Sequence, residues 1–148
     1  MTARAVVYWA ATGFVVFNML SGGLAELAQV KSTSDGMQAL GYPLYMMTIL
    51  GTWKVLGSIA LLTPRFPRLK EWAYAGMFFN MTGAAVSHLV VGNEAWHVWY
   101  TASLAIVVLV SWALRPESRT LRAPVIHAAL PAVGRPKLAG AGVSAYSG

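Results

Sequence analysis

Residues 44–62 read LYMMTILGTWKVLGSIALL, a stretch in which Lys54, near the middle, is the only charged side chain. An apolar helix of about 20 residues is long enough to cross the hydrocarbon core of a bilayer. A charge at that depth costs from about 3 to over 10 kcal/mol, so it usually faces the interior of a helix bundle and a partner. The stretch therefore predicts a membrane helix with a polar inward face.

The composition places the whole chain in the same class. Hydrophobic residues make up 57% of the 148 residues, charged residues make up 11%, and the mean hydropathy is +0.56. A soluble domain of this size carries about 25% charged residues. The net charge of +6 does not indicate a nucleic-acid partner, because the cations lie in loops and in the tail. The absence of cysteine excludes disulfides, thiol redox chemistry and thiolate metal sites in this chain.

Apolar stretches along the chain predict an all-α fold, a four-transmembrane-helix antiparallel bundle that forms one domain over residues 1–115. The expected spans are residues 5–29, 44–62, 72–91 and 96–114. The apolar run of the first span exceeds the roughly 7–15 residues of a signal-peptide core, so we expect it to be retained. A short helix is expected over residues 32–40, with Ser34 as its N-cap and Gly41 after its end.

Basic residues predict the orientation of the bundle. Arg4 precedes the first span, and further Lys and Arg residues lie between the second and third spans and after the fourth. The other two loops carry only Lys31 beside Asp35, and Glu94. Because cytoplasmic segments are enriched in Lys and Arg, both termini are expected in the cytoplasm. We therefore expect a multi-pass protein of the cell (inner) membrane, whose residues 116–148 form a disordered basic tail.

Polar residues converge inside the predicted bundle and form a candidate binding site. Asn18 and Glu26 share one face of the first span, Lys54 lies on the second, and Asn80 and His88 lie on the third. We expect the Lys54 amine to extend toward the outer side and pair with Glu26, directly or through His88 or water. The alternative is that this pair only fixes the order and register of the helices.

Glycines accompany these polar residues on the same helix faces. Gly51 lies on the face of Lys54, and Gly76 and Gly83 lie in a row with Asn80. Rows of small residues allow membrane helices to approach closely, so we expect helix contacts at these glycines. The fourth span shows no comparable polar face and is expected to close the bundle as a packing helix.

The sequence contains no self-contained catalytic motif, and we assign no catalytic residue. A serine–histidine–carboxylate site, a glycine-rich phosphate loop and a dinucleotide motif are all missing. His88 and His97 lie on separate spans and give only a weak signal for a haem or a metal, so we assign neither. A histidine near Glu and Lys is more typical of a proton relay or of a hydrogen bond to a quinone carbonyl. Trp53 or Met47 would then supply an apolar wall.

Several short motifs surround these residues. They are GGLAE at 22–26, GYP at 41–43, GTWKVLG at 51–57, LKEWAYAG at 69–76 and SH at 87–88. Together they resemble the DoxX-like family of small four-helix membrane proteins over about residues 8–116. The resemblance leads us to expect a carboxylate in many relatives where this chain has Asn80, which argues against a proton-carrying role for that position.

The resemblance implies a link to membrane redox chemistry, because the namesake of the family is associated with a quinone-linked sulfur oxidoreductase. Without cysteine, this chain would need a bound quinone or a partner subunit for any redox role, so it is at most the membrane subunit of an oxidoreductase. The partners to expect are the lipid bilayer, a soluble or membrane redox partner, and further copies of the chain in a homo-oligomer.

Three hypotheses stay open at this point. The first is a quinone-binding or redox-complex membrane subunit with a polar intramembrane cluster. The second is a small-molecule or proton-coupled transporter, against which stands the lack of an obvious inverted repeat between the two halves. The third is a non-catalytic membrane assembly or scaffold protein, in which the polar interior only specifies packing.

Overall fold

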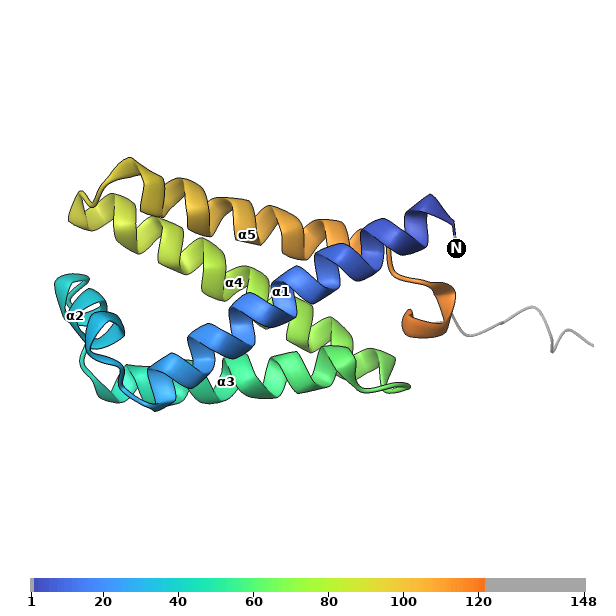
Figure 1. Cartoon of the computed structure of the whole chain (residues 1–148), viewed down its shortest axis with the longest axis horizontal. Helices are drawn as coiled ribbons and strands as arrows, with labels where there is room; N and C mark the ends of the chain where they lie inside the picture. The colour runs from blue at the N-terminus through green and yellow to red at the C-terminus, as the bar shows by residue number, and fades with distance from the viewer. Residues whose placement is uncertain (1, 122–148) are drawn as a thin grey trace, which may run out of the picture.

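The computed structural model describes residues 2–121, and every regular element in that part of the chain is helical. The all-α prediction is therefore confirmed. The elements are α1 (Ala3–Leu27), α2 (Lys31–Ala39), α3 (Tyr45–Leu62), α4 (Pro67–Val91), α5 (Ala95–Ala113) and a 3-10 turn, η1 (Glu117–Arg119). In Figure 1 the four long helices form an elongated bundle, and the short α2 lies at one end of it.

By length and composition, α1, α3 and α5 are able to cross a membrane. The helix α4 is as long as α1, with 25 residues, but does not meet the same hydropathy criterion. Its polar residues, which include Asn80, Ser87 and His88, explain the difference. The third of the expected spans therefore forms as a long helix, but its polar residues make it less apolar than the other three long helices.

Local backbone chemistry shifts the helix ends from the predicted bounds. α4 begins at Pro67 rather than at residue 72, because proline fits the first helical position and Phe66 before it is left-handed, with φ of 51°. α1 ends at Leu27 rather than at residue 29, because Gln29 is also left-handed, with φ of 48°. Apolar composition predicted the long helices and not these turns.

The short helix α2 forms within one residue of its predicted bounds, but its predicted N-cap was wrong. It begins after Val30 without a side-chain cap, and Ser34 lies inside it and donates to the carbonyl of Gln29 at 3.2 Å. Its end agrees with the prediction, because Gly41 is left-handed with φ of 79°. The amides of Gly41 and Tyr42 donate to the last carbonyls of the helix, at 2.9 and 3.0 Å, as in a Schellman motif.

The four long helices close into a ring in which α1 contacts α3 and α5, while α4 contacts α5 and α3. The core is built from aliphatic and methionine side chains of the four long helices together with Tyr74. A buried hydroxyl network crosses it. Ser111 Oγ lies 2.7 Å from Thr12 Oγ1 and 2.8 Å from the hydroxyl of Tyr74, which joins α1, α4 and α5.

At the end of the bundle away from α2, basic side chains donate hydrogen bonds to the last carbonyls of α3. Lys70 is 1% exposed, and its amine donates to the carbonyls of Ala60 at 2.9 Å and of Thr63 at the end of α3. Arg119 donates to the carbonyl of Leu61 at 2.9 Å, and its guanidinium lies over the ring of Trp9. These contacts satisfy carbonyls that the last turn of a helix leaves without partners.

The ordered contacts of Arg119 correct one expectation about the tail. Residues 116–121 were expected to be disordered, but they contain η1 and pack against α1 and α3. A basic residue that caps a neighbouring helix explains why the chain stays folded past Arg115. The remainder of the predicted tail, residues 122–148, lies outside the described residues.

The helices α1 and α3 approach each other closely at two glycines. A Cβ atom at Gly51 would lie 2.7 Å from the carbonyl oxygen of Gly23, and one at Gly23 would lie 2.9 Å from Cβ of Lys54. The expected helix contact at Gly51 is therefore confirmed. The expectation was wrong for Gly76 and Gly83, because no atom lies within 4 Å of a Cβ built at either position. Those two glycines of α4 border open space.

The substitution Gly51→Ala tests this contact. Alanine is normally more favourable than glycine inside a helix by about 1 kcal/mol. At Gly51 the new methyl group meets backbone, so we expect a loss of stability of about 1–3 kcal/mol, as is typical of overpacking. The matched control is Gly22→Ala, which has no atom within 4 Å of the new Cβ and should not lower the melting temperature in detergent. Equal melting temperatures for the two variants would contradict the contact.

Candidate functional site

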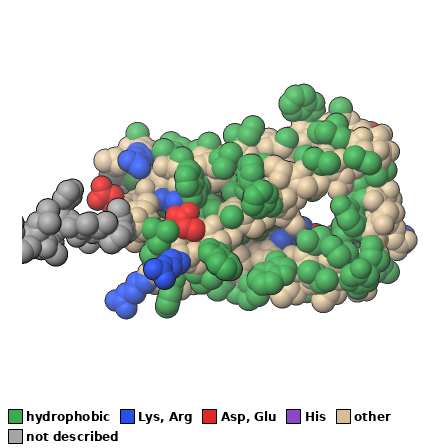
Figure 2. Space-filling model, turned by 180° about the vertical axis from the view of Figure 1, so that it is seen from behind, with side chains coloured by type: hydrophobic (Ala, Val, Ile, Leu, Met, Phe, Trp, Pro, Cys, Tyr) green, Lys and Arg blue, Asp and Glu red, His purple; other side chains and the backbone are tan. Residues whose placement is uncertain are grey.

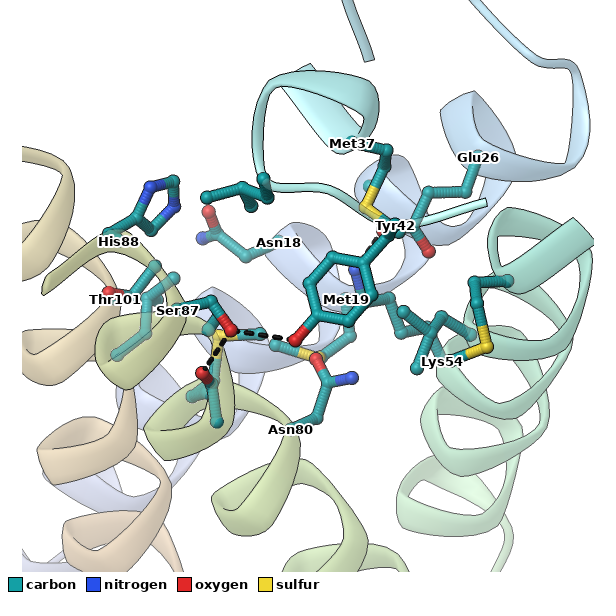
Figure 3. A pocket seen from close by; sticks show the side chains of 18 of the residues that line it. Asn18, Met19, Glu26, Met37, Tyr42, Lys54, Asn80, Ser87, His88 and Thr101 are labelled. Atoms are coloured by element: carbon teal, nitrogen blue, oxygen red, sulfur yellow. Dashed lines mark hydrogen bonds and ion pairs between the residues drawn. The ribbon is translucent and has the colours of Figure 1, made fainter. Parts of the chain in front are cut away.

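A cavity of about 450 Å³ lies at the end of the bundle where α2 is found. All five residues predicted as a binding site line it, together with side chains from each of the five α-helices. The predicted residues are Asn18, Glu26, Lys54, Asn80 and His88. Figure 3 shows Glu26 and Lys54 on one side of the cavity and His88 on the other. The sequence therefore identified residues that the fold brings to one place.

The predicted pairing of Lys54 with Glu26 is direct. Lys54 Nζ donates to Oε1 of Glu26, and the two side chains are 14% and 7% exposed. The close approach of α1 and α3 at Gly23 and Gly51 brings the two residues together, since Glu26 Cβ itself would lie 3.1 Å from a Cβ at Gly51. A buried charge without a partner is costly, so each residue stabilises the other.

The second carboxylate oxygen of Glu26 is not paired with Lys54 or with any other described residue. Oε2 is buried and has no hydrogen-bond partner among the described residues. Buried polar atoms are nearly always hydrogen-bonded, and one that is not requires an explanation such as a missing ligand or water. Glu26 also lines the cavity, so this unpaired acceptor belongs to a side chain that a ligand in the cavity would contact.

Two tyrosines bridge helices around the same cavity. Ser87 donates to the carbonyl of Gly83 at 2.9 Å, so its oxygen accepts the proton of Tyr42, which lies 2.7 Å away (Figure 3). The hydroxyl of Tyr100 donates to Oδ1 of Asn18 at 2.6 Å. These bonds tie the α2–α3 connection to α4 and tie α5 to α1, which holds the walls of the cavity in place.

His88 is not part of the ion pair, contrary to one of the expected arrangements. Its Nδ1 lies 2.9 Å from the amide nitrogen of Asn93, and its ring stacks on His97 with 5.1 Å between the ring centres. An amide nitrogen can only donate, so Nδ1 is the acceptor and a neutral His88 carries its proton on Nε2. The residue therefore contributes a hydrogen-bond donor to the lining of the cavity, apart from Glu26 and Lys54.

Sequence reasoning missed several residues of the cavity and misplaced others. Tyr42, Tyr100 and Thr101 line it, although α5 was expected only to pack. Tyrosine at a helix end is typical of a membrane interface as well, so only the GYP motif gave a signal for Tyr42. The proposed apolar walls were wrong, because Met47 is fully buried in packing and Trp53 lies outside this cavity. Met19, Leu50 and Leu104 provide apolar surface instead.

A double-mutant cycle tests the ion pair. Lys54→Met and Glu26→Gln each leave one partner buried and unpaired, so each should lower the free energy of unfolding by about 3–5 kcal/mol. The double variant should lose clearly less than the sum of the two, as measured by unfolding in detergent micelles. The exposed pair of Lys31 and Asp35 on α2 provides the control cycle and should show little coupling. Additive losses for Lys54 and Glu26 would show that the two do not interact.

Comparison with known proteins covers nearly all of the helical part of the chain. The model of the DoxX-like family matches residues 5–113, which include every residue that lines the cavity. No curated protein and no solved structure matches the chain. The match extends over well more than half of the sequence, and the protein belongs to the DoxX-like family.

Proposed function

We propose that the chain is a four-span protein of the cell (inner) membrane with both termini in the cytoplasm. The two ends of the helical domain and the loop between α3 and α4 lie together at one end of the bundle, opposite α2 (Figure 1). That end carries Arg4, Arg65, Arg68 and Arg115, while Glu94 lies in the α4–α5 connection at the other end. This separation of charge favours a cytoplasmic location for the basic end.

Within this topology, the chain acts as a quinone-binding membrane subunit of a redox complex. The observation that carries this proposal is the free oxygen of Glu26, buried in a cavity beside the amine of Lys54. A quinone ring in its reduced form bears hydroxyl groups that can donate to Oε2. In its oxidised form the ring bears carbonyl oxygens that accept from Lys54 or His88. A site with both a strong acceptor and strong donors suits a ring that changes between these two forms.

The size and lining of the cavity support the same ligand class. Small-molecule sites have volumes of about 300–1,000 Å³ and combine apolar walls with a few placed polar groups. This cavity has about 450 Å³, with Met19, Leu50 and Leu104 as apolar surface and the Glu26–Lys54 pair as polar group. A protein whose polar interior served only to specify packing would be expected to fill this space with side chains.

The role of this chain would be to bind and orient the ring and to accept a hydrogen bond from the hydroxyl of the reduced ring at Glu26. Because the sequence contains no cysteine, sulfur chemistry would belong to a partner subunit. Among the described residues, no group of three or more histidine or acidic side chains is arranged to hold a metal ion. The electrons exchanged with the quinone would therefore pass to or from a redox partner bound to this membrane subunit.

The topology is tested with reporter fusions. A reporter fused after Val91 should lie outside the cell, and one fused after Leu114 should lie in the cytoplasm, because the basic segments resist translocation. A third fusion after Thr63, in the basic loop between α3 and α4, should also give a cytoplasmic signal. An outside signal after Leu114 would contradict the four-span arrangement.

Ligand binding is tested by comparing two matched substitutions, Glu26→Gln and Glu94→Gln, in protein reconstituted into lipid nanodiscs. Hydrogen bonds to charged groups contribute about 1.5–3 kcal/mol, so loss of the carboxylate should weaken binding of a tail-less benzoquinol by about tenfold or more. Glu94 does not line the cavity, and its variant should bind like the wild type.

A further variant keeps the binding test independent of the ion pair. His88→Ala leaves Lys54 and Glu26 untouched and should weaken binding of the oxidised ring, because it removes a donor from the cavity wall. Binding that is unchanged in both Glu26→Gln and His88→Ala, or no saturable binding to the wild type, would contradict a quinone site in this cavity.

A further inference from the structure

A second cavity, of about 510 Å³, adjoins the polar one between α3 and α4. Four residues line both cavities: Met19, Leu50, Lys54 and Asn80. The two spaces therefore share a wall at the level of Lys54, in the middle of α3. We call the second cavity the α3–α4 groove. Figure 2 shows this face of the molecule hollowed, with atoms of a basic side chain visible inside the hollow.

The chemistry of the α3–α4 groove differs from that of the polar cavity. Away from the shared residues, its lining consists of apolar side chains and the glycines Gly57 and Gly76. Its outer edge is formed by side chains on the surface of the bundle, where Trp53 is 69% exposed and Trp72 is 81% exposed. In the proposed topology this surface faces the hydrocarbon of the bilayer, so the groove is open to lipid from the side.

Glycine keeps both spaces open. No atom lies within 4 Å of a Cβ built at Gly76 in the groove, or of one built at Gly83 in the polar cavity. These are the positions that the sequence pattern predicted to be helix contacts. Their lack of a side chain instead leaves room beside α4, next to Asn80 in both cases.

We propose that the α3–α4 groove holds the hydrocarbon chain of the same ligand whose ring occupies the polar cavity. This inference rests on the proposed function and names the ligand class more narrowly, as a ring with a long apolar tail that enters sideways from the bilayer. The occupant follows from the four residues that line both spaces, which place the α3–α4 groove directly beside the polar cavity. In this arrangement the chain of a ligand whose ring lies beside Glu26 and Lys54 passes Lys54 and Asn80, which line both spaces. It then continues between the apolar side chains of the groove toward the membrane.

A hydrocarbon chain gains little from moving out of lipid into an apolar groove, because both surroundings are apolar. The groove would therefore select tailed ligands through packing contacts with the tail and by leaving space for the tail beside α4. A side chain placed in the groove should interfere with the tail and leave the ring site unaffected. The position Gly76 allows this test, since a Cβ atom built there has no neighbouring atom within 4 Å.

The experiment uses three glycine-to-leucine variants of the full chain in nanodiscs. Gly76→Leu places a side chain in the α3–α4 groove, and Gly83→Leu places one in the polar cavity. Gly13→Leu on α1 is the control, because Gly13 lines neither cavity and a Cβ atom there has no neighbouring atom within 4 Å. Each variant is measured with a tail-less benzoquinol and with the same ring bearing a decyl chain. The ratio of variant to wild-type affinity cancels the different partition of the two ligands into lipid.

We expect Gly76→Leu to weaken binding of the decyl ligand by about tenfold and to leave the tail-less ring unaffected. Gly83→Leu should weaken both ligands, and Gly13→Leu should weaken neither. If Gly76→Leu changes neither affinity, or changes both equally, the tail does not lie in the groove, although the ring site stands. If that variant only reduces phospholipid that copurifies with the protein, the groove holds a lipid chain and the proposal is wrong. If the wild type binds neither ligand, the proposed function fails together with this inference.

Discussion

The ion pair between Glu26 and Lys54 constrains the rest of this bundle. A charge in the middle of α3 requires a partner, and the close approach of α1 brings Glu26 to it. Gly23 and Gly51 make that approach possible, because neither helix tolerates a methyl group there. With α1 held against α3 on one side, α4 is left next to open space on the other, and both cavities lie along that space.

The two ends of the bundle differ in how completely their buried polar groups are paired. At the basic end, Lys70 and Arg119 satisfy the carbonyls that end α3, and Ser111 joins the hydroxyls of Thr12 and Tyr74 in the core. At the other end a carboxylate oxygen stays unpaired and buried in a cavity. The unpaired acceptor and the cavity around it make this second end the candidate ligand-binding end of the bundle.

The helices and the ion pair could be predicted from the sequence because each follows from one strong physical rule. Apolar length identifies a membrane helix, and an intramembrane charge such as Lys54 needs a partner. The cavities escaped prediction for a different reason. Glycine looks the same in sequence whether it admits a neighbouring helix, as at Gly51, or leaves a void, as at Gly76. The facing helix decides between the two, and the same holds for Arg119, whose acceptor lies far away in the sequence, on α3.

Infrared difference spectroscopy of isotope-labelled glutamate is the most direct test of a charged Glu26 with one oxygen bonded to Lys54 and the other free for a ligand. Subtracting the spectrum of Glu26→Gln isolates the band of this side chain from those of the other acidic residues. The ligand-free protein should show an ionised carboxylate, and its frequency should shift when a tail-less benzoquinol is added. A protonated acid in the ligand-free protein, or a carboxylate band that does not respond to the ligand, would contradict this arrangement.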